Sequence, residues 1–331
     1  MTLIDFTYIN SHGGLNIAQY VLEYLSERED YNDFLILFDK RNFLKLKPYN
    51  LKYNVISKNE ISRFTFYSKN KTSFDSIICF ANVPPPIKQK KKVKVYFHNE
   101  LLLNTKGSEM AFLKKIILFF KKLYIRRLDF GYSWHVQTSH LKKLLTSSLN
   151  IKEEKIFISP IFKEITFNKK TKTPNTFLYP TSDSKHKNNR RLISAFVFAS
   201  KKVNHKINLK LTLEQPKTDE FILPKNLEIE YLGQLKHEEL INHYAVSKYL
   251  IFPSLKESFG LPIVEGFQSD CIILASDLNF VHEILETKYV FNPYEIEDIA
   301  EKITLVLNSE NISNQALKAS NLINKIFEHE L

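Results

Sequence analysis

The stretch from Tyr249 to Glu283 reads YLIFPSLKESFGLPIVEGFQSDCIILASDLNFVHE and predicts one strand–helix–strand unit. The apolar runs at 249–254 and 271–276 are typical of buried strands, and the segment between them predicts a helix that begins near Pro262. Proline suits the first helical turn because its missing N–H would be unpaired there. Two strands joined through a helix favour a parallel sheet, so we expect an α/β fold.

The same alternation of short β-rich runs and helical patterns fills both halves of the chain. The polar, basic segment 163–175 separates the halves and has the composition of a linker. The 331 residues suffice for two domains with a core each. We predict a first domain over 1–165, a second over 166–310, and a helical tail over 311–331 for which packing back on the first domain is one option.

The loop before the predicted helix contains residues suited to bind phosphate and sugar. The free N–H groups of a first helical turn, together with the helix dipole, form a site for a phosphate. Glu257 lies in this loop and Glu265 lies near the helix start. Sugar and ribose hydroxyls are natural partners for carboxylates beside an anion site. Alternatively, Glu265 only favours the positive helix end and Glu257 is solvated.

The wider pattern F-P-S-x-x-E-S-F-G-L-P-x-x-E-G resembles the E-x7-E signature of the retaining glycosyltransferases of family 4. Glu257 and Glu265 match the two glutamates of that signature. The downstream Ser276, Asp277 and Glu283 are similar to the S-D…E of the family. The resemblance implies the GT-B fold, in which two Rossmann-like domains with parallel sheets face each other across a cleft.

Other blocks follow in the family's order. Lys187, Asn188 and the LISA that follows resemble K-G-x-x-x-L-I-x-A, whose lysine holds the donor diphosphate. HGGLN at 12–16 resembles a glycine loop near the donor phosphates and the acceptor. His98 matches a histidine at a strand end that faces the cleft. The resemblance covers most of the chain and is strongest over 176–286.

The resemblance implies a role for each matched residue. Glu257 contacts the donor sugar and, with His98, is assigned to catalysis, while Lys187 contacts the diphosphate and Glu265 the nucleotide ribose. In this family the leaving phosphate is thought to help deprotonate the acceptor on the same face, so no protein base is assigned. The remaining donor-binding positions are Ser258, Phe259, Gly260, Leu261, Gly13 and Gly14.

Several of these residues have a simpler interpretation. A lone histidine is more often structural, although ligands of parallel sheets bind at the carboxyl ends of strands, where His98 lies. Gly13 and Gly14 also suit an ordinary tight turn. Thr181 stands where the family often has an arginine, and Phe280 replaces a small residue near the donor. Candidates for the missing charge are Lys185, His186 and Arg190.

The sequence indicates no metal and no cofactor beyond the nucleotide sugar itself. It contains no D-x-D and no His, Cys and carboxylate cluster with ligand spacing. Cys79 and Cys271 lie in apolar runs and are expected to be buried in a reduced, cytoplasmic protein. The N-terminus lacks the pattern of a secretory signal, and no apolar run approaches the roughly 20 residues that span a bilayer.

The charge of the chain favours anionic partners. Lys and Arg number 47 against 36 Asp and Glu, which gives a net charge of +11. AFLKKIILFFKKLYIRR, at 111–127 within a helix expected over 108–128, predicts a basic amphipathic face within an arc of roughly 140°. Such a helix can bind the anionic inner face of a membrane. Alternatively, its apolar side packs on the core of the domain. The cations of this face are Lys114, Lys115, Lys121, Lys122 and Arg126.

The expected function is transfer of a sugar from a nucleotide-diphosphate sugar to a glycan or lipid-linked acceptor, with retention, in cell-surface polysaccharide synthesis. A GT-B nucleotide-sugar epimerase is one alternative, and product analysis without acceptor separates the two. A non-catalytic binder of polyanions or membranes is another. Nucleic acid is not an expected partner, because the basic residues lack interleaved aromatic side chains. The donor sugar, the nucleotide base, the acceptor and the oligomeric state are left open.

Overall fold

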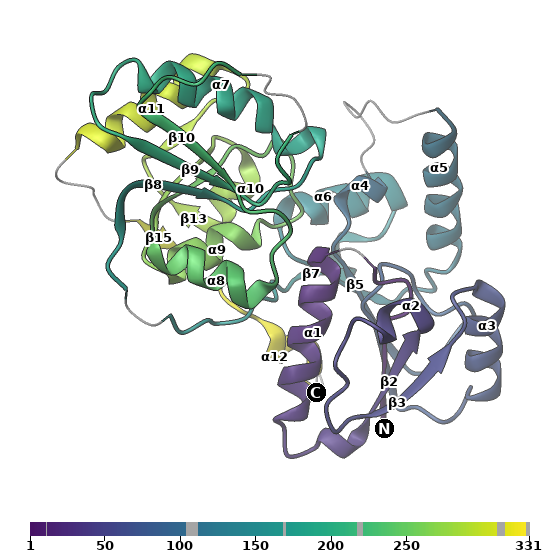
Figure 1. Cartoon of the computed structure of the whole chain (residues 1–331). Coiled ribbons are helices and arrows are strands. Elements are labelled where there is room, and N and C mark those ends of the chain that lie inside the picture. Colours follow the sequence, from purple (N-terminus) through teal and green to yellow (C-terminus); the bar gives the residue numbers. More distant parts are fainter. Residues whose placement is uncertain (11, 104–111, 168–169, 217–220, 310–314, 329–331) are drawn as a thin grey trace. The chain divides into compact units, whose positions relative to one another are not determined.

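The computed structural model describes residues 1–10, 12–103, 112–167, 170–216, 221–309 and 315–328. The chain folds into two compact units, one formed by Met1–Lys163 with Asn321–Leu331 and the other by Glu164–Ser320. Each unit contains one large parallel sheet (Figure 1). The expected α/β fold with two parallel sheets is therefore confirmed. The expected domain limits at 165 and 310 remain predictions, because the structure does not test whether the segments that they define fold independently.

The first unit has a seven-stranded sheet in the order β3-β2-β1-β4-β5-β6-β7, with every neighbouring pair parallel. Helices cover both of its faces. Its strands are β1 (Thr2–Asp5), β2 (Phe34–Asp39), β3 (Lys52–Ile56), β4 (Ser76–Cys79), β5 (Lys92–Phe97), β6 (Ser133–Val136) and β7 (Ile156–Ile158). Its helices are α1 (His12–Ser26), α2 (Lys40–Phe43), α3 (Glu60–Lys69), α4 (Glu100–Leu103), α5 (Phe112–Arg127), α6 (Ser139–Leu149) and α12 (Ile323–Phe327), with short 3-10 turns at Tyr31–Asp33 and Glu153–Lys155.

Two hydrophobic clusters lie on opposite sides of this sheet. One joins the sheet to α3, α4, α5 and α6 and contains Trp134 and Leu141. The other joins the sheet to α1 and to α12, whose Phe327 packs edge-on against Phe34 with ring centroids 6.1 Å apart. Such burial on both faces explains why β1, β2 and β4 are short, largely apolar runs, whereas the start of β5 alternates lysine and valine.

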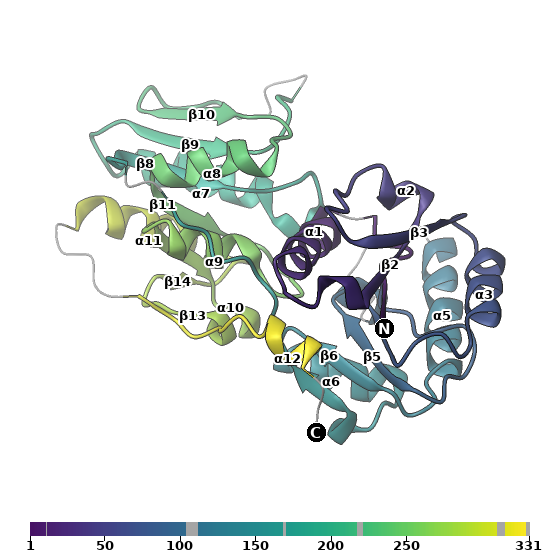
Figure 2. The same ribbon diagram turned by 90° about the horizontal axis from the view of Figure 1, so that it is seen from below.

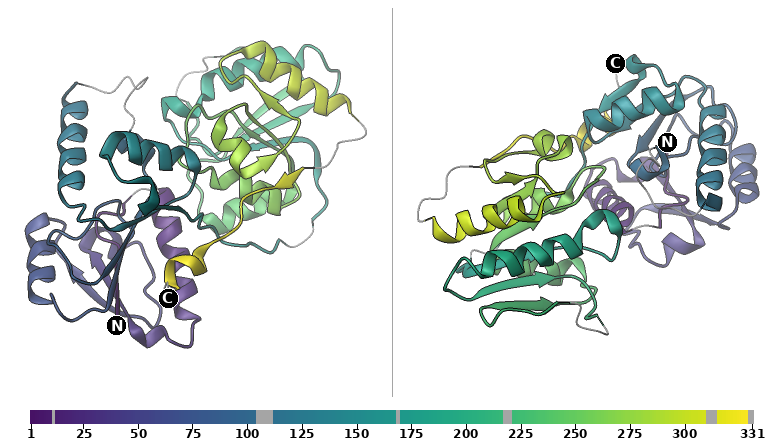
Figure 3. Two further views of the ribbon diagram at one scale, coloured as in Figure 1. Left: turned by 180° about the vertical axis from the view of Figure 1, so that it is seen from behind. Right: turned by 90° about the horizontal axis from the view of Figure 1, so that it is seen from above.

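The second unit has a six-stranded parallel sheet in the order β10-β9-β8-β11-β12-β14. Helices α7 and α11 pack side by side on one face, and α8 and α9 lie on the other (Figures 1 and 3). The strands are β8 (Thr173–Tyr179), β9 (Ile207–Leu211), β10 (Leu227–Tyr231), β11 (Ser247–Phe252), β12 (Ile272–Ser276) and β14 (Val290–Phe291), with β13 (Leu285–Glu286) and β15 (Ala316–Leu317) as a separate antiparallel pair. The helices are α7 (Asn189–Ser200), α8 (His237–Val246), α9 (Leu261–Gln268), α10 (Asn279–Ile284) and α11 (Ile296–Asn308), preceded by the 3-10 turn η3 (Lys185–Lys187).

Some local expectations differ from the structure. The expected loop around Gly13 and Gly14 is wrong, because α1 already begins at His12. The chain after Ile296 is not uniformly helical, since β15 pairs with β13. The helix expected from Ser108 is described from Phe112, and its start lies outside the described residues.

Candidate functional site

The loop between β11 and α9 is shaped by Gly260, which caps α9 with φ +108°. A side chain is strained in this left-handed region, and a Cβ would stand 3.4 Å from Ile263 Cδ1. Pro262 occupies the first turn of α9, as the sequence predicts. The first turn of α9 therefore begins directly after the loop that contains Glu257 and Ser258.

Lys187 and Glu257 form an ion pair, with Lys187 Nζ 2.6 Å from Glu257 Oε1. Both side chains are largely buried, at 16% and 17% exposure. The Lys187 ammonium also lies 5.5 Å from the ring centroid of Phe252, the last residue of β11. Two residues that lie seventy positions apart in the chain thus meet at the carboxyl ends of β8 and β11, where parallel sheets bind ligands.

Hydrogen bonds fix the two loops on either side of this pair. The Tyr179 hydroxyl donates to the Lys187 carbonyl at 2.7 Å and lies 3.0 Å from Ser254 Oγ. The Leu255 N–H donates to the His186 carbonyl at 2.8 Å. Lys187 and Glu257 therefore extend from backbone that is held at three points, and their pairing is part of an ordered arrangement.

Asn188 joins three loops of the second unit. It has φ +62°, and its Nδ2 donates to the carbonyls of Pro253 at 3.2 Å and Pro293 at 2.7 Å. Asparagine is among the few residues that adopt the left-handed conformation at low cost, which explains how it occupies the place of the family's glycine. The Asn188 side chain adds two hydrogen bonds that a glycine could not make. The sequence pattern showed the replacement but not these contacts.

Glu265 contacts two residues that the sequence analysis did not single out. Its Oε1 lies 2.9 Å from His237 Nε2, and its Oε2 accepts from the Tyr244 hydroxyl at 2.8 Å. His237 begins α8 and Tyr244 lies near its end. Burial and the nearby Glu265 raise the pKa of Tyr244 well above its usual value, so this hydroxyl stays protonated and donates. His237 and Tyr244 precede Glu265 by 28 and 21 residues, and no helix or strand periodicity in the sequence indicates contacts over such separations.

Four further positions lie around the same strand ends. Phe259 is buried, and Leu261 is the first residue of α9. The Phe280 ring is buried and packs edge-on against Phe252, with centroids 6.2 Å apart. Thr181 donates through its hydroxyl to Asn189 Oδ1 at 2.8 Å. At position 181, where the family often has an arginine, this chain therefore has a threonine that makes a hydrogen bond to nearby Asn189.

The first unit contains the other predicted residues, His98, Gly13 and Gly14. His98 follows β5, and its backbone N–H donates to Asn82 Oδ1 at 2.7 Å. Its ring Nδ1 is buried and has no hydrogen-bonding partner among the described residues. Burial lowers the pKa of His98 to about 4, so the ring is neutral near pH 7. Gly14 is buried in the first turn of α1, whereas Gly13 is exposed.

Three further expectations concern metal ions, the cysteines and membrane spans. Within the described ranges, no three His, Cys, Asp or Glu side chains gather closely enough to hold a metal ion. Metal independence itself remains a prediction. Cys79 and Cys271 are both free and buried, as expected. In the described part of the chain, no helix is long and apolar enough to cross a membrane.

The arrangement of strands and helices has counterparts among solved structures. A structure of Anabaena Alr3699/HepE in complex with UDP and glucose matches 93% of this chain and 89% of its own, with a TM-score of 0.66 and 11% sequence identity. WaaG, a glycosyltransferase involved in lipopolysaccharide biosynthesis, matches 93% and 91% of the two chains, with a TM-score of 0.66 and 13% identity. The fold is that of the GT-B glycosyltransferases. At these identities the similarity shows the fold alone.

Sequence comparisons match part of the chain to known glycosyltransferases. Residues 161–322 match the family model described as Glycosyl transferases group 1. The O-antigen chain mannosyltransferase RfbU of Salmonella typhimurium is 26% identical over 190 residues, which cover 53% of this chain and 50% of RfbU. This chain therefore spans about half the length of that relative. Together the matches support a GT-B glycosyltransferase.

Proposed function

We propose that the protein is a retaining glycosyltransferase that moves a sugar from a nucleotide-diphosphate sugar to a glycan or lipid-linked acceptor in cell-surface polysaccharide synthesis. The observation that carries the proposal is the Lys187–Glu257 pair beside the first turn of α9. The family match over 161–322, and the similarity to an O-antigen mannosyltransferase, support the same reaction class. The E-x7-E pattern at Glu257 and Glu265 favours the family 4 subtype.

In the proposed complex the donor diphosphate replaces Glu257 as the ion-pair partner of the Lys187 ammonium. A diphosphate is a stronger partner for a lysine than one carboxylate, and the N–H groups of α9 add to its binding. Glu257 is then released toward the hydroxyls of the donor sugar. As the bond from the sugar to phosphate breaks, Lys187 and the backbone N–H groups stabilise the charge that develops on the leaving nucleotide.

Glu265 contacts the ribose in this proposal, while Tyr244 and His237 hold its carboxylate in place. Two hydrogen bonds leave further lone pairs on the carboxylate for ribose hydroxyls. His98, neutral near pH 7, contacts the reacting sugar through its ring. The leaving phosphate accepts the proton of the acceptor hydroxyl, so no side chain of the chain is assigned as a base.

A donor screen tests the proposal. UDP-, GDP- and ADP-sugars are added to the purified protein, and its melting temperature is measured, because a ligand that binds only the folded state raises it. We expect a rise with sugars of one nucleotide. The donor found in this way is then incubated without acceptor. Conversion to an epimeric nucleotide sugar would favour the epimerase instead.

We expect sugar transfer to survive EDTA. The charge of the leaving diphosphate is met by Lys187 and by the amides of α9, so chelation removes nothing that the mechanism needs. Transfer rates are compared with and without EDTA in large excess over trace metal. Full loss on chelation, restored by magnesium or manganese, would contradict this part of the proposal.

We further propose that the α5 surface binds an anionic membrane, where a lipid-linked acceptor is located. The apolar side of α5 is not packed on the core throughout, since Leu113 is 68% and Phe120 61% exposed. Helix α3 lies beside α5 (Figure 2), joined to it by a hydrogen bond from the Tyr124 hydroxyl to Glu60, and adds Ile61 at 77% exposure. Exposed cations of α5 are Lys115, Lys121, Arg126 and Arg127.

Exposed apolar side chains beside cations fit the interface of an anionic bilayer, since the apolar groups enter the headgroup region and the cations bind lipid phosphates. Each Lys or Arg near such a surface contributes about 1 kcal/mol. Four cations together with the exposed apolar side chains suffice for reversible binding.

We expect the protein to sediment with vesicles of phosphatidylglycerol at low salt and to be released at high salt. The double variant Phe119→Ser/Phe120→Ser should lose most of this binding, because it removes two exposed rings of α5. Leu305→Ser, at an exposed position of α11, is the matched control and should bind like wild type. Equal recovery of wild type in the supernatant with anionic and neutral vesicles at low salt would rule out the membrane surface.

A further inference from the structure

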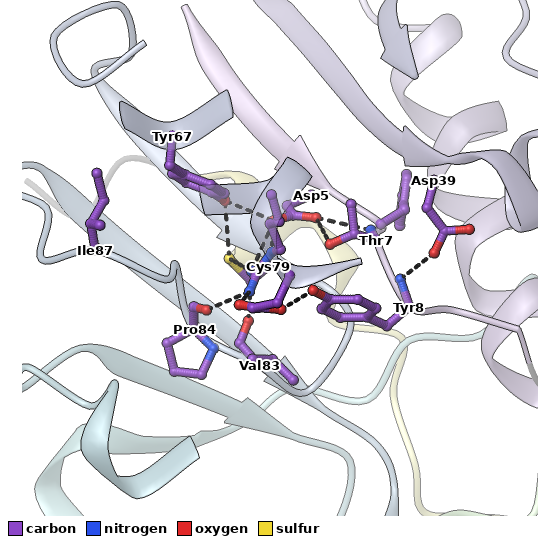
Figure 4. A network of polar contacts seen from close by, with 12 residues as sticks. Asp5, Thr7, Tyr8, Asp39, Tyr67, Cys79, Val83, Pro84 and Ile87 are labelled. Atoms are coloured by element: carbon purple, nitrogen blue, oxygen red, sulfur yellow. Dashed lines mark hydrogen bonds and ion pairs between the residues drawn. The ribbon is translucent and has the colours of Figure 1, made fainter. Parts of the chain in front are cut away.

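A fully buried ion pair connects α3 to the carboxyl end of β1. The side chains of Arg63 and Asp5 are both 0% exposed, and Arg63 Nη2 lies 2.9 Å from Asp5 Oδ2. The Asp5 carboxylate also accepts from the Thr7 N–H at 2.9 Å and from the Tyr67 hydroxyl at 2.8 Å (Figure 4). A buried pair with this many hydrogen bonds is a rigid anchor, because loss of either partner leaves an uncompensated charge.

The other donors of Arg63 hold the segment that follows β4. Nη1 donates to the Pro84 carbonyl at 2.9 Å, and Nη2 donates to the Val83 carbonyl at 3.1 Å (Figure 4). The guanidinium is planar with its donors in a fixed fork, so it sets the direction of both carbonyls. The backbone at 83–84 is thereby fixed relative to β1.

Asn82, directly before this segment, connects it to His98. Its backbone has φ +64°, and the residue is largely buried. Its Oδ1 accepts the N–H of His98 at 2.7 Å. Strands β4 and β5 are parallel neighbours, so Asn82 after β4 and His98 after β5 emerge at the same edge of the sheet. Hydrogen bonds and the chain itself therefore connect Asp5, through Arg63 and the backbone at 82–84, to His98.

We propose that Asn82 is the positioning residue of His98 and that the Asp5–Arg63 pair holds Asn82 in place. The inference rests on the proposed function, in which the ring of His98 contacts the reacting sugar. The hydrogen bond fixes the peptide at the start of His98 and so the direction in which its side chain leaves the sheet. Displacement of a positioned group by about 1 Å is enough to cost on the order of 10²-fold in rate.

Asn82→Gly and Asn82→Asp form a matched pair of variants. Glycine adopts φ +64° without strain but has no acceptor for the His98 N–H, whereas aspartate keeps an acceptor oxygen at the same distance from the backbone. We expect Asn82→Gly to melt within a few degrees of wild type, with kcat reduced about tenfold or more and the KM for the donor unchanged. Asn82→Asp should retain most of the kcat.

A double-mutant cycle with His98→Ala shows whether Asn82 acts through His98. If it does, Asn82→Gly causes no further loss of kcat in the His98→Ala background. Additive losses, or an Asn82→Gly variant with wild-type kcat, would overturn the inference. Full activity of His98→Ala alone would also overturn it, since His98 then has no role to position. Sugar transfer by the wild type is measured first, so failure of the proposed function is seen separately.

Discussion

Glu257→Gln is expected to lose most sugar transfer and yet to bind the nucleoside diphosphate product more tightly than wild type. The two effects have one cause. The Glu257 carboxylate pairs with the Lys187 ammonium, 2.6 Å away and largely shielded from solvent. Glutamine is a weaker partner for the ammonium, so the diphosphate meets less competition. The same change removes the carboxylate that contacts the donor sugar.

The expected loss in kcat/KM is on the order of 10²-fold, the size found when one preorganised polar contact of a transition state is removed. The expected gain in diphosphate affinity is about two- to tenfold, in line with a partly buried ion pair that contributes about 1 kcal/mol. Calorimetry with the nucleoside diphosphate and initial rates with the donor measure the two effects. Glu286→Gln, an exposed glutamate of the same unit, is the control. An unchanged kcat/KM for Glu257→Gln would contradict the assignment.

Lys187→Ala is expected to weaken binding of both the donor and the nucleoside diphosphate by about 10- to 100-fold. A hydrogen bond to a charged group contributes about 1.5–3 kcal/mol, and the lysine is the cation nearest to Glu257 among the described ion pairs. The variant also leaves Glu257 without its partner at 17% exposure, which adds repulsion against an incoming phosphate. Both effects act in the same direction.

Calorimetry with the nucleoside diphosphate, compared between wild type and Lys187→Ala, measures this loss. Lys288→Ala, at an exposed position of the same unit, should bind like wild type. The opposite responses of Lys187→Ala and Glu257→Gln provide a further check, since a donor placed elsewhere predicts no change in either. Binding of wild-type strength by Lys187→Ala would show that the diphosphate is placed wrongly.

The fold could be predicted because strong local patterns encode it, whereas the partners of the central ion pair came from the resemblance to a known family. Apolar runs of strand length predicted β11 and β12, and Pro262 predicted the start of α9. The resemblance assigned Lys187 and Glu257 to one ligand, and the structure places them in contact. Periodicity could not find β13 and β15, because two-residue strands are too short to show alternation.

The contacts that depend on tertiary packing were not predictable from the sequence. Nothing in the pattern around Glu265 indicates that His237 and Tyr244 hold its carboxylate. The left-handed conformation of Asn82 and its bond to His98 depend on two neighbouring strands ending at one edge. For α5 the sequence left two alternatives for the apolar side, and only the packing of the first unit shows that Phe120 remains exposed.

The most direct test of the account is sugar transfer itself. The donor identified by the melting-temperature screen is incubated with the protein and with a glycan or lipid-linked acceptor extracted from membranes, and the acceptor is analysed by mass spectrometry and anomeric NMR. The proposed mechanism predicts that the acceptor gains one sugar per nucleoside diphosphate released, with the anomeric configuration of the donor, and that Glu257→Gln abolishes most of this gain. Release of the nucleoside diphosphate without gain on any acceptor, or a product of inverted configuration, would contradict it.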